Sequence, residues 1–150
     1  MIPIKTADDA AQAVDAMAGL LERLRAVLEQ ETELVRAGKV RTATGLGATK
    51  TELAGQLFTS SERLKANAKF VRQSAPASCA ALGRAQEAFR AVLQRNMMVL
   101  ATAHAVSEGI VRRLSGDLAR KRSPQVYGAS GRAAAQNPKL GQPLALSRTL

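Results

Sequence analysis

Two polar residues, Glu31 and Asn96, stand where the helical spacing of this sequence otherwise puts apolar residues. A carboxylate such as that of Glu31 can act as a general acid or base, but that chemistry needs a second group held at a set distance. The sequence shows no such partner. The alternative is structural, because a polar residue at a core position can lie near a bundle end or make a buried hydrogen bond that fixes helix register. The pattern favours this structural role for both residues.

The chain contains one His and one Cys, and therefore few of the residues that metal and redox chemistry use. An internal disulfide and a Cys-based zinc site are excluded, and so are most His-based sites. His104 is predicted to be a partly exposed or hydrogen-bonded helix residue, and Cys79 to be an inert small apolar one. Gly45 and Gly47 before Lys50 are a faint match to a phosphate-binding loop that lacks its spacing and its strand. We expect no metal, no cofactor and no small-molecule substrate.

Positive charge is concentrated in the second half of the chain. The formal net charge is +10, and after Asp117 there are no acidic residues. This balance is compatible with nucleic acid or a membrane surface as partner, but charge alone defines no site. The run Arg120-Lys121-Arg122 could bind phosphates, yet Tyr127 is the one aromatic of the tail and there is no helix-turn-helix pattern. The sequence favours a solvated charge cluster over a nucleic-acid site.

A first helix is predicted from about residue 8 to about residue 37. Thr6 followed by Asp8 and Asp9 indicates its start, because a hydroxyl caps free amide groups and acids favour the positive end of the helix dipole. Gly38 suits its end, since glycine readily takes the left-handed conformation that closes helices. The apolar residues recur at alternating steps of three and four, with Glu31 at the one missing step; they are Val14, Met17, Leu21, Leu24, Leu28 and Val35.

Two further helices are predicted, over about 40–72 and about 78–120. The Gly and Thr residues at 42–49 weaken the start of the second, and Pro76 ends it or forces a turn. Its apolar series is Leu46, Leu53, Leu57, Leu64 and Val71. The third helix has Asn96 seated within a longer series, namely Leu82, Ala85, Phe89, Val92, Val99, Ala103, Val106, Ile110, Leu114 and Leu118.

These helices predict an all-α fold, an elongated antiparallel three-helix bundle with coiled-coil character over residues 1–122. The Pro- and Gly-rich segment 123–150 shows no sustained period and is predicted to be a flexible, basic, disordered tail. The N-terminus lacks the apolar core of a signal peptide, and no run of 18 apolar residues occurs. The sequence thus predicts a cytoplasmic protein with no direct membrane insertion.

The third helix is apolar on more than one face around Met97 to Leu100. Core packing accounts for part of this surplus. An adaptable groove for a partner protein accounts for it equally well, because Met side chains repack easily.

Several separated features together resemble the FlgN-like flagellar export chaperones. The first two helices contribute the run Leu28, Glu31, Leu34, Gly38, Leu46, Lys50 and Leu53. The last helix contributes Asn96, Met97 to Leu100, Val106, Ile110 and Leu114. A Tyr127-Gly128-Ala129-Ser130-Gly131-Arg132 box follows in the tail, at the place where that family has one. The weak start of the second helix and the length of the tail beyond Gly131 depart from the family pattern.

The resemblance implies a chaperone of flagellar type III secretion, without enzymatic activity, that binds hook-associated proteins before export and delivers them to the export gate. In that family the C-terminal helical region holds the substrate, which implies a substrate-protein surface at Asn96, Val99, Leu100, Val106 and Ile110. The tail tyrosine contributes to docking on the export gate, which implies that role for Tyr127 with Gly131. The alternative is a basic structural or nucleic-acid-associated helical protein, favoured by the charge of the second half.

Overall fold

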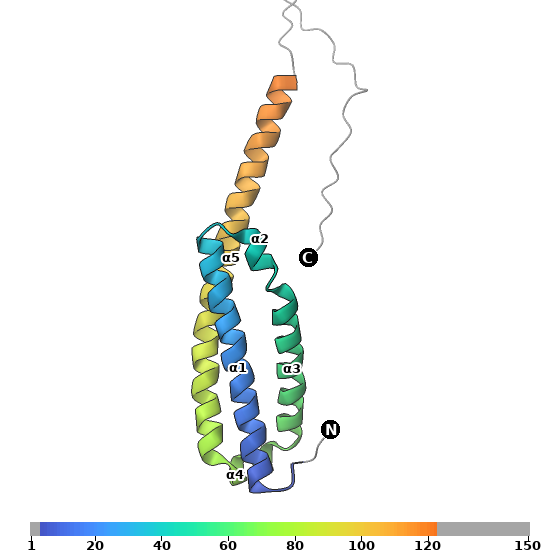
Figure 1. Ribbon diagram of the computed structural model, residues 1–150, viewed down its shortest axis with the longest axis vertical. Helices are drawn as coiled ribbons and strands as arrows, with labels where there is room; N and C mark the ends of the chain where they lie inside the picture. The colour runs from blue at the N-terminus through green and yellow to red at the C-terminus, as the bar shows by residue number, and fades with distance from the viewer. Residues whose placement is uncertain (1–3, 123–150) are drawn as a thin grey trace, which may run out of the picture. The chain divides into compact units, whose positions relative to one another are not determined.

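A computed structural model of the protein describes residues 4–122, and all secondary structure within that range is helical. The all-α class predicted from the sequence is thereby confirmed. Five helices follow one another, α1 (Ala7–Arg36), α2 (Val40–Thr44), α3 (Gly47–Ala66), α4 (Ala68–Ser74) and α5 (Pro76–Arg122) (Figure 1). Between residues 4 and 122, no helix has the length and apolar character needed to cross a membrane.

The chain separates into two compact units, Met1–Glu108 and Gly109–Leu150. The boundary lies inside α5, whereas the sequence placed its domain boundary after residue 122. The predicted tail at 123–150 lies outside the described residues.

A capping box starts α1. The backbone amide of Asp9 donates to Thr6 Oγ1 at 3.0 Å, and Asp9 Oδ2 accepts from the amides of Thr6 at 2.9 Å and Lys5 at 3.1 Å. The Lys5 amide, followed by the hydroxyl and the amide of Thr6, holds the pKa of the Asp9 carboxyl below its usual range. The capping hydroxyl of Thr6 and the acidic residue Asp9, both predicted from the sequence, therefore cap the same turn reciprocally.

Glycine ends α1. The helix runs to Arg36, and Gly38 adopts a φ of +72° that side chains with a Cβ rarely take. The Gly38 amide donates to the Val35 carbonyl at 3.0 Å and the Lys39 amide to the Leu34 carbonyl at 2.8 Å. The left-handed glycine thus satisfies carbonyls that the helix leaves free and turns the chain into α2.

The second predicted helix, over 40–72, is divided into α2, α3 and α4. Gly45 and Leu46 separate α2 from α3, at the weak Gly and Thr run. Asn67 separates α3 from α4, and its Nδ2 donates to the Arg63 carbonyl at 2.9 Å, so that the side chain replaces a backbone partner. Pro76, expected to end this helix or force a turn, is the first residue of α5, where its missing N–H costs nothing.

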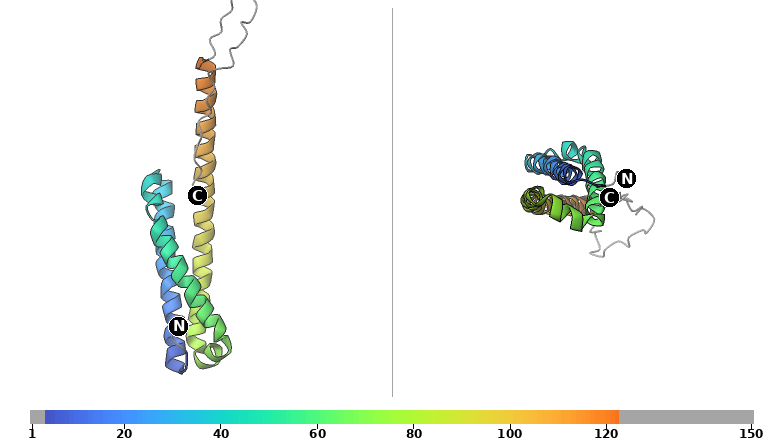
Figure 2. Two further views of the ribbon diagram at one scale, coloured as in Figure 1. Left: turned by 90° about the vertical axis from the view of Figure 1, so that its right-hand side faces the viewer. Right: turned by 90° about the horizontal axis from the view of Figure 1, so that it is seen from below.

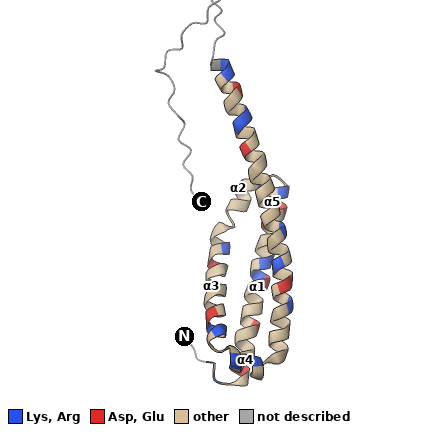
Figure 3. Cartoon of the chain, turned by 180° about the vertical axis from the view of Figure 1, so that it is seen from behind, with Lys and Arg blue, Asp and Glu red and all other residues tan. Residues whose placement is uncertain are grey.

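The helices of the first unit pack side by side. Figures 1 and 2 show α3 returning along α1, and the part of α5 that belongs to this unit lying along α1 as well. α1 also contacts α2, which precedes α3, and α4, which follows it. Acidic and basic residues are interspersed along α1 and α3 (Figure 3).

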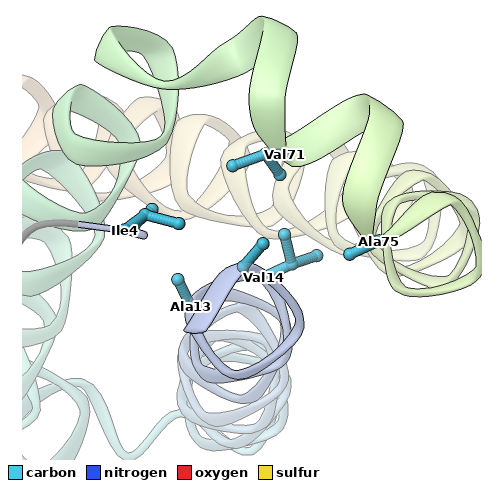
Figure 4. Packing of buried hydrophobic residues seen from close by; sticks show 6 residues of the cluster. Ile4, Ala13, Val14, Val71 and Ala75 are labelled. Carbon is cyan, nitrogen blue, oxygen red and sulfur yellow. The ribbon is translucent and has the colours of Figure 1, made fainter. Parts of the chain in front are cut away.

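One apolar cluster closes the end of this unit where α1 begins. It joins Ile4 before α1, the first turns of α1, α4 and the link to α5 (Figure 4). Most members are small, which lets the helix backbones approach closely; they are Ile4, Ala10, Ala13, Val14, Val71 and Ala75. Cys79 and Leu82 of α5 pack against the cluster from the side.

Burial along α3 predicts which of its apolar residues contribute to the stability of the fold. Leu53 is 3% exposed and Phe58 is 67% exposed. Leu53→Ala should lower the free energy of unfolding by about 3 kcal/mol, because it opens a cavity in the core. Phe58→Ala should change it by less than about 0.5 kcal/mol. Urea unfolding followed by circular dichroism measures both, and equal losses for the two variants would contradict this packing.

Candidate functional site

Three helices each place a polar residue on their apolar stripe at the same level of the first unit. In α1 it is Glu31, between Leu28 and Val35, and in α5 it is Asn96, between Val92 and Val99. The third is Lys50 of α3, which lies between Leu46 and Leu53 at the same alternating steps of four and three. We call Glu31, Thr32, Lys50 and Asn96 the polar cluster.

The Glu31 carboxylate bridges the other two helices. Lys50 Nζ donates to Glu31 Oε1 at 2.5 Å, and Asn96 Nδ2 donates to Glu31 Oε2 at 2.9 Å. Each carboxylate oxygen therefore accepts from a different helix. Such a bridge fixes the relative register of α1, α3 and α5, because sliding any one helix breaks a bond to a buried charge.

Asn96 also binds the backbone and a hydroxyl of α1. Its two amide hydrogens are shared among Glu31 Oε2, the Leu28 carbonyl at 3.2 Å and Thr32 Oγ1 at 3.2 Å. Thr32 in turn donates its hydroxyl hydrogen to the Leu28 carbonyl at 2.8 Å. Asn96, at 2% exposed, and Glu31 and Thr32, at 4%, are nearly closed to solvent, whereas the Lys50 side chain is 27% exposed. A dry environment makes these bonds costly to break.

The polar cluster is built as a structural lock, that is, a set of buried hydrogen bonds that holds the helices in register. Both carboxylate oxygens of Glu31 are occupied, and Glu31 lines neither the cavity along α3 nor the one between α1 and α5. Acid or base chemistry at Glu31 would need a substrate atom within hydrogen-bond reach. The geometry therefore agrees with the register-fixing role that the sequence favoured.

Sequence reasoning missed Lys50 and Thr32 as members of this cluster. Lys50 could have been found from the spacing alone, because it fills the step between Leu46 and Leu53 in the stripe of α3. Thr32 could have been found in the same way, because it lies four residues after Leu28 and three before Val35 on the apolar stripe of α1. In the structure it is 4% exposed, and its Oγ1 accepts from Asn96 Nδ2.

An apolar groove lies next to the polar cluster. It has a volume of about 370 Å³ and is formed by the last turn of α1 and by α5, where Met98 is 65% exposed. Its lining residues are Val35, Arg36, Met98, Val99, Thr102 and Ala103. All of them belong to the first unit. An exposed, flexible Met at the edge of a small apolar groove is typical of surfaces that adapt to protein partners.

The stripe of α5 changes from buried to exposed along this groove. Val92 is 8% exposed and Asn96 is 2% exposed, whereas Val106 on the same stripe is 57% exposed. Val99 and Ala103, between them, are half-buried. The residues of a core-facing stripe thus continue past the polar cluster with little of the described chain to cover them.

The residues predicted for a substrate-protein surface are placed in different environments. Val99 and Leu100 are half-buried and Val106 is exposed, all in the first unit; Ile110, in the second unit, is 54% exposed. Asn96 is inside the unit and its amide is committed to α1, so its burial does not support contact with a partner and we leave it out of the surface. Tyr127 and Gly131 lie outside the described residues.

The remaining residues considered for chemistry form no site. His104 Nδ1 lies 3.8 Å from Glu108 Oε1 on the exposed side of α5. The Cys79 thiol is half-buried and points to the Val71 carbonyl, with 3.8 Å between sulfur and oxygen. Within residues 4–122, no group of three or more His, Cys, Asp or Glu side chains could hold a metal ion.

Comparison with family models, with curated proteins and with solved structures gives no match.

A double-mutant cycle tests the lock between α1 and α3. Lys50→Met leaves the buried Glu31 carboxylate without its cation, and Glu31→Gln removes the charge. The two substitutions should be coupled by about 1 to 2 kcal/mol in the free energy of unfolding. The exposed pair Glu62 and Lys65, 2.8 Å apart, is the matched control, with expected coupling below about 0.5 kcal/mol. Additive effects at Glu31 and Lys50, measured by urea unfolding, would contradict the lock.

Proposed function

We propose that the protein is a FlgN-like flagellar export chaperone, which binds hook-associated proteins before type III secretion and delivers them to the export gate. The observation that carries the proposal is the exposure of Val106 on the stripe that is buried at Val92 and Asn96. A core-type helix face without a covering helix is a surface onto which a partner helix can pack. The motif resemblance, which spans nearly the whole chain, supports the same function.

The proposed scaffold is an elongated antiparallel three-helix bundle with coiled-coil character, formed by α1, α3 and α5. The spacing of the apolar residues supports it, in steps of three and four in α1 and α5 and of seven and four in α3, since such spacing produces knobs-into-holes packing. The polar cluster fits this scaffold as a register-fixing layer.

The proposed binding surface in the first unit consists of Val99, Leu100 and Val106, beside the groove edged by Met98. Ile110 remains a predicted member from the sequence. Hook-associated proteins kept unfolded before export would offer amphipathic segments, and such a segment can bury its apolar face by adding a helix to this surface. No catalytic step, cofactor or small-molecule substrate belongs to the proposal, and the proposed location is the cytoplasm.

Two valine variants test the binding surface. Val106→Asp places a charge on the exposed stripe and should weaken binding of a purified hook-associated protein at least about tenfold, because a carboxylate would be buried without a partner. Val40→Asp, at the start of α2 where Val40 is 49% exposed, is the matched control and should bind normally. Isothermal titration calorimetry measures both affinities, and circular dichroism shows that both variants fold.

Salt separates this function from its alternative. Binding of an apolar helical segment should change little between low and high salt, whereas binding of a nucleic acid should fall steeply as counter-ions compete. If Val106→Asp binds the hook-associated protein as tightly as the unaltered chain, the surface is wrong. If nucleic acid is the ligand that binds, the basic structural or nucleic-acid-associated function replaces the chaperone function.

Tyr127 is proposed to contact the export gate, together with Gly131. An aromatic anchor can supply much of the energy when a short segment docks in a pocket. Tyr127→Ala should leave the melting temperature and capture of the hook-associated protein unchanged, but weaken binding of the loaded chaperone to the cytosolic domain of the gate. Calorimetric titration with that domain measures the effect. Equal affinities for Tyr127→Ala and the unaltered chain would remove Tyr127 from the docking site.

A further inference from the structure

The helical part of the second unit, residues 109–122, carries an exposed apolar face of its own. Its four large apolar residues are each between 49% and 58% exposed. They are Ile110, Val111, Leu114 and Leu118. At 100° per residue these positions fall within one arc of about 100°, which is the width of the apolar face of an amphipathic helix.

The rest of this segment is strongly basic. Residues 109–122 contain five Arg and Lys against one acid, Asp117. On the helical wheel Arg112, Arg113 and Arg120 fall opposite the apolar arc. Figure 3 shows the basic segments in the last turns of α5, with acidic segments between and below them. Lys121 falls inside the arc, about 20° from Ile110, where a long lysine side chain can keep its ammonium in a polar layer while its stem lies along apolar groups.

The spacing of the apolar residues differs from that in the bundle. From Val92 to Ile110 the stripe of α5 advances in alternating steps of four and three, the spacing of a narrow coiled-coil seam. From Ile110 through Leu114 to Leu118 it advances in steps of four, and Val111 widens it. Steps of four move the apolar positions progressively around the helix axis, so that such a seam turns away from a straight partner helix. A broad apolar arc instead suits a flat surface. Charges of nearly one sign also differ from the mixed charges beside coiled-coil seams.

We propose that residues 109–122 of α5 bind the surface of an anionic membrane, lying in its headgroup layer with the apolar arc inward. Charge complementarity selects this occupant, because anionic lipid headgroups attract the basic residues and the acyl boundary takes up the apolar ones. A nucleic acid would satisfy the basic residues alone and leave the apolar arc in water. The association is peripheral, in keeping with the lack of a membrane-crossing helix in residues 4–122. The inference does not rest on the chaperone function proposed above, and Ile110 is the one residue that the two proposed surfaces share.

Vesicle sedimentation with the full-length chain tests the proposal. The chain should sediment with vesicles of phosphatidylglycerol and phosphatidylcholine in equal parts, and not with vesicles of phosphatidylcholine alone. Leu114→Ser should lower the partition coefficient about tenfold, the loss expected when a buried leucine is removed. The double variant Arg113→Gln with Arg120→Gln should lower it by about tenfold or more, since each basic residue contributes to attraction at an anionic surface.

Matched controls come from exposed positions in the first unit. Phe58→Ser removes a side chain that is 67% exposed on α3, and the double variant Arg84→Gln with Arg90→Gln removes two exposed charges from the first half of α5. Both should sediment as the unaltered chain does. All substituted positions are exposed, so circular dichroism should show the same helix content throughout.

Three results would overturn the proposal. The first is failure of the unaltered chain to sediment with the anionic vesicles. The second is equal sedimentation of Leu114→Ser and the unaltered chain, which would mean that charge alone attracts the protein. The third is a dimer of the free chain that Leu114→Ser dissociates in analytical ultracentrifugation, while vesicle binding stays unchanged; the apolar face would then be covered by a second copy of the chain.

Discussion

The buried carboxylate of Glu31 is the constraint on which the arrangement of the first unit depends. A charge that is 4% exposed is tolerated only when its oxygens are satisfied, and here Lys50 and Asn96 satisfy one oxygen each. Apolar stripes of leucine and valine can pack in several registers of similar free energy. The three polar groups from three helices meet at one level in this register, which favours it over the others.

The stripe of α5 becomes exposed beyond the polar cluster. Val92 and Asn96 are buried and Val99 and Ala103 are half-buried, whereas Val106 on the same stripe is mostly in contact with water. α1 ends at Arg36, where Gly38 turns the chain, so the apolar surface that covers α5 ends close to the polar cluster. The geometry of one turn thus decides how much of α5 is core and how much is surface.

Much of the fold follows from the sequence, and particular residues show where inference stops. The stripe of α1 and its caps at Thr6 and Gly38 are local signals, and the structure has them in place. At Asn67 the helix divides because the side-chain Nδ2, in place of a backbone amide, donates to the Arg63 carbonyl. This hydrogen bond competes closely with the backbone hydrogen bond of a continuous helix. The stripe of α5 predicts a face but not what covers it, so the burial of Asn96 and the exposure of Val106 required the tertiary structure.

The polar cluster is assembled from segments at very different separations along the chain. Lys50 lies 19 residues from Glu31, whereas Asn96 lies 65 residues from it. Closing the longer loop costs about 1 kcal/mol more in chain entropy than closing the shorter one. We therefore expect the hairpin of α1 and α3 to form first during folding, with α5 joining it afterwards. During synthesis on the ribosome, the Glu31 carboxylate would meet Lys50 while Asn96 is still to be made.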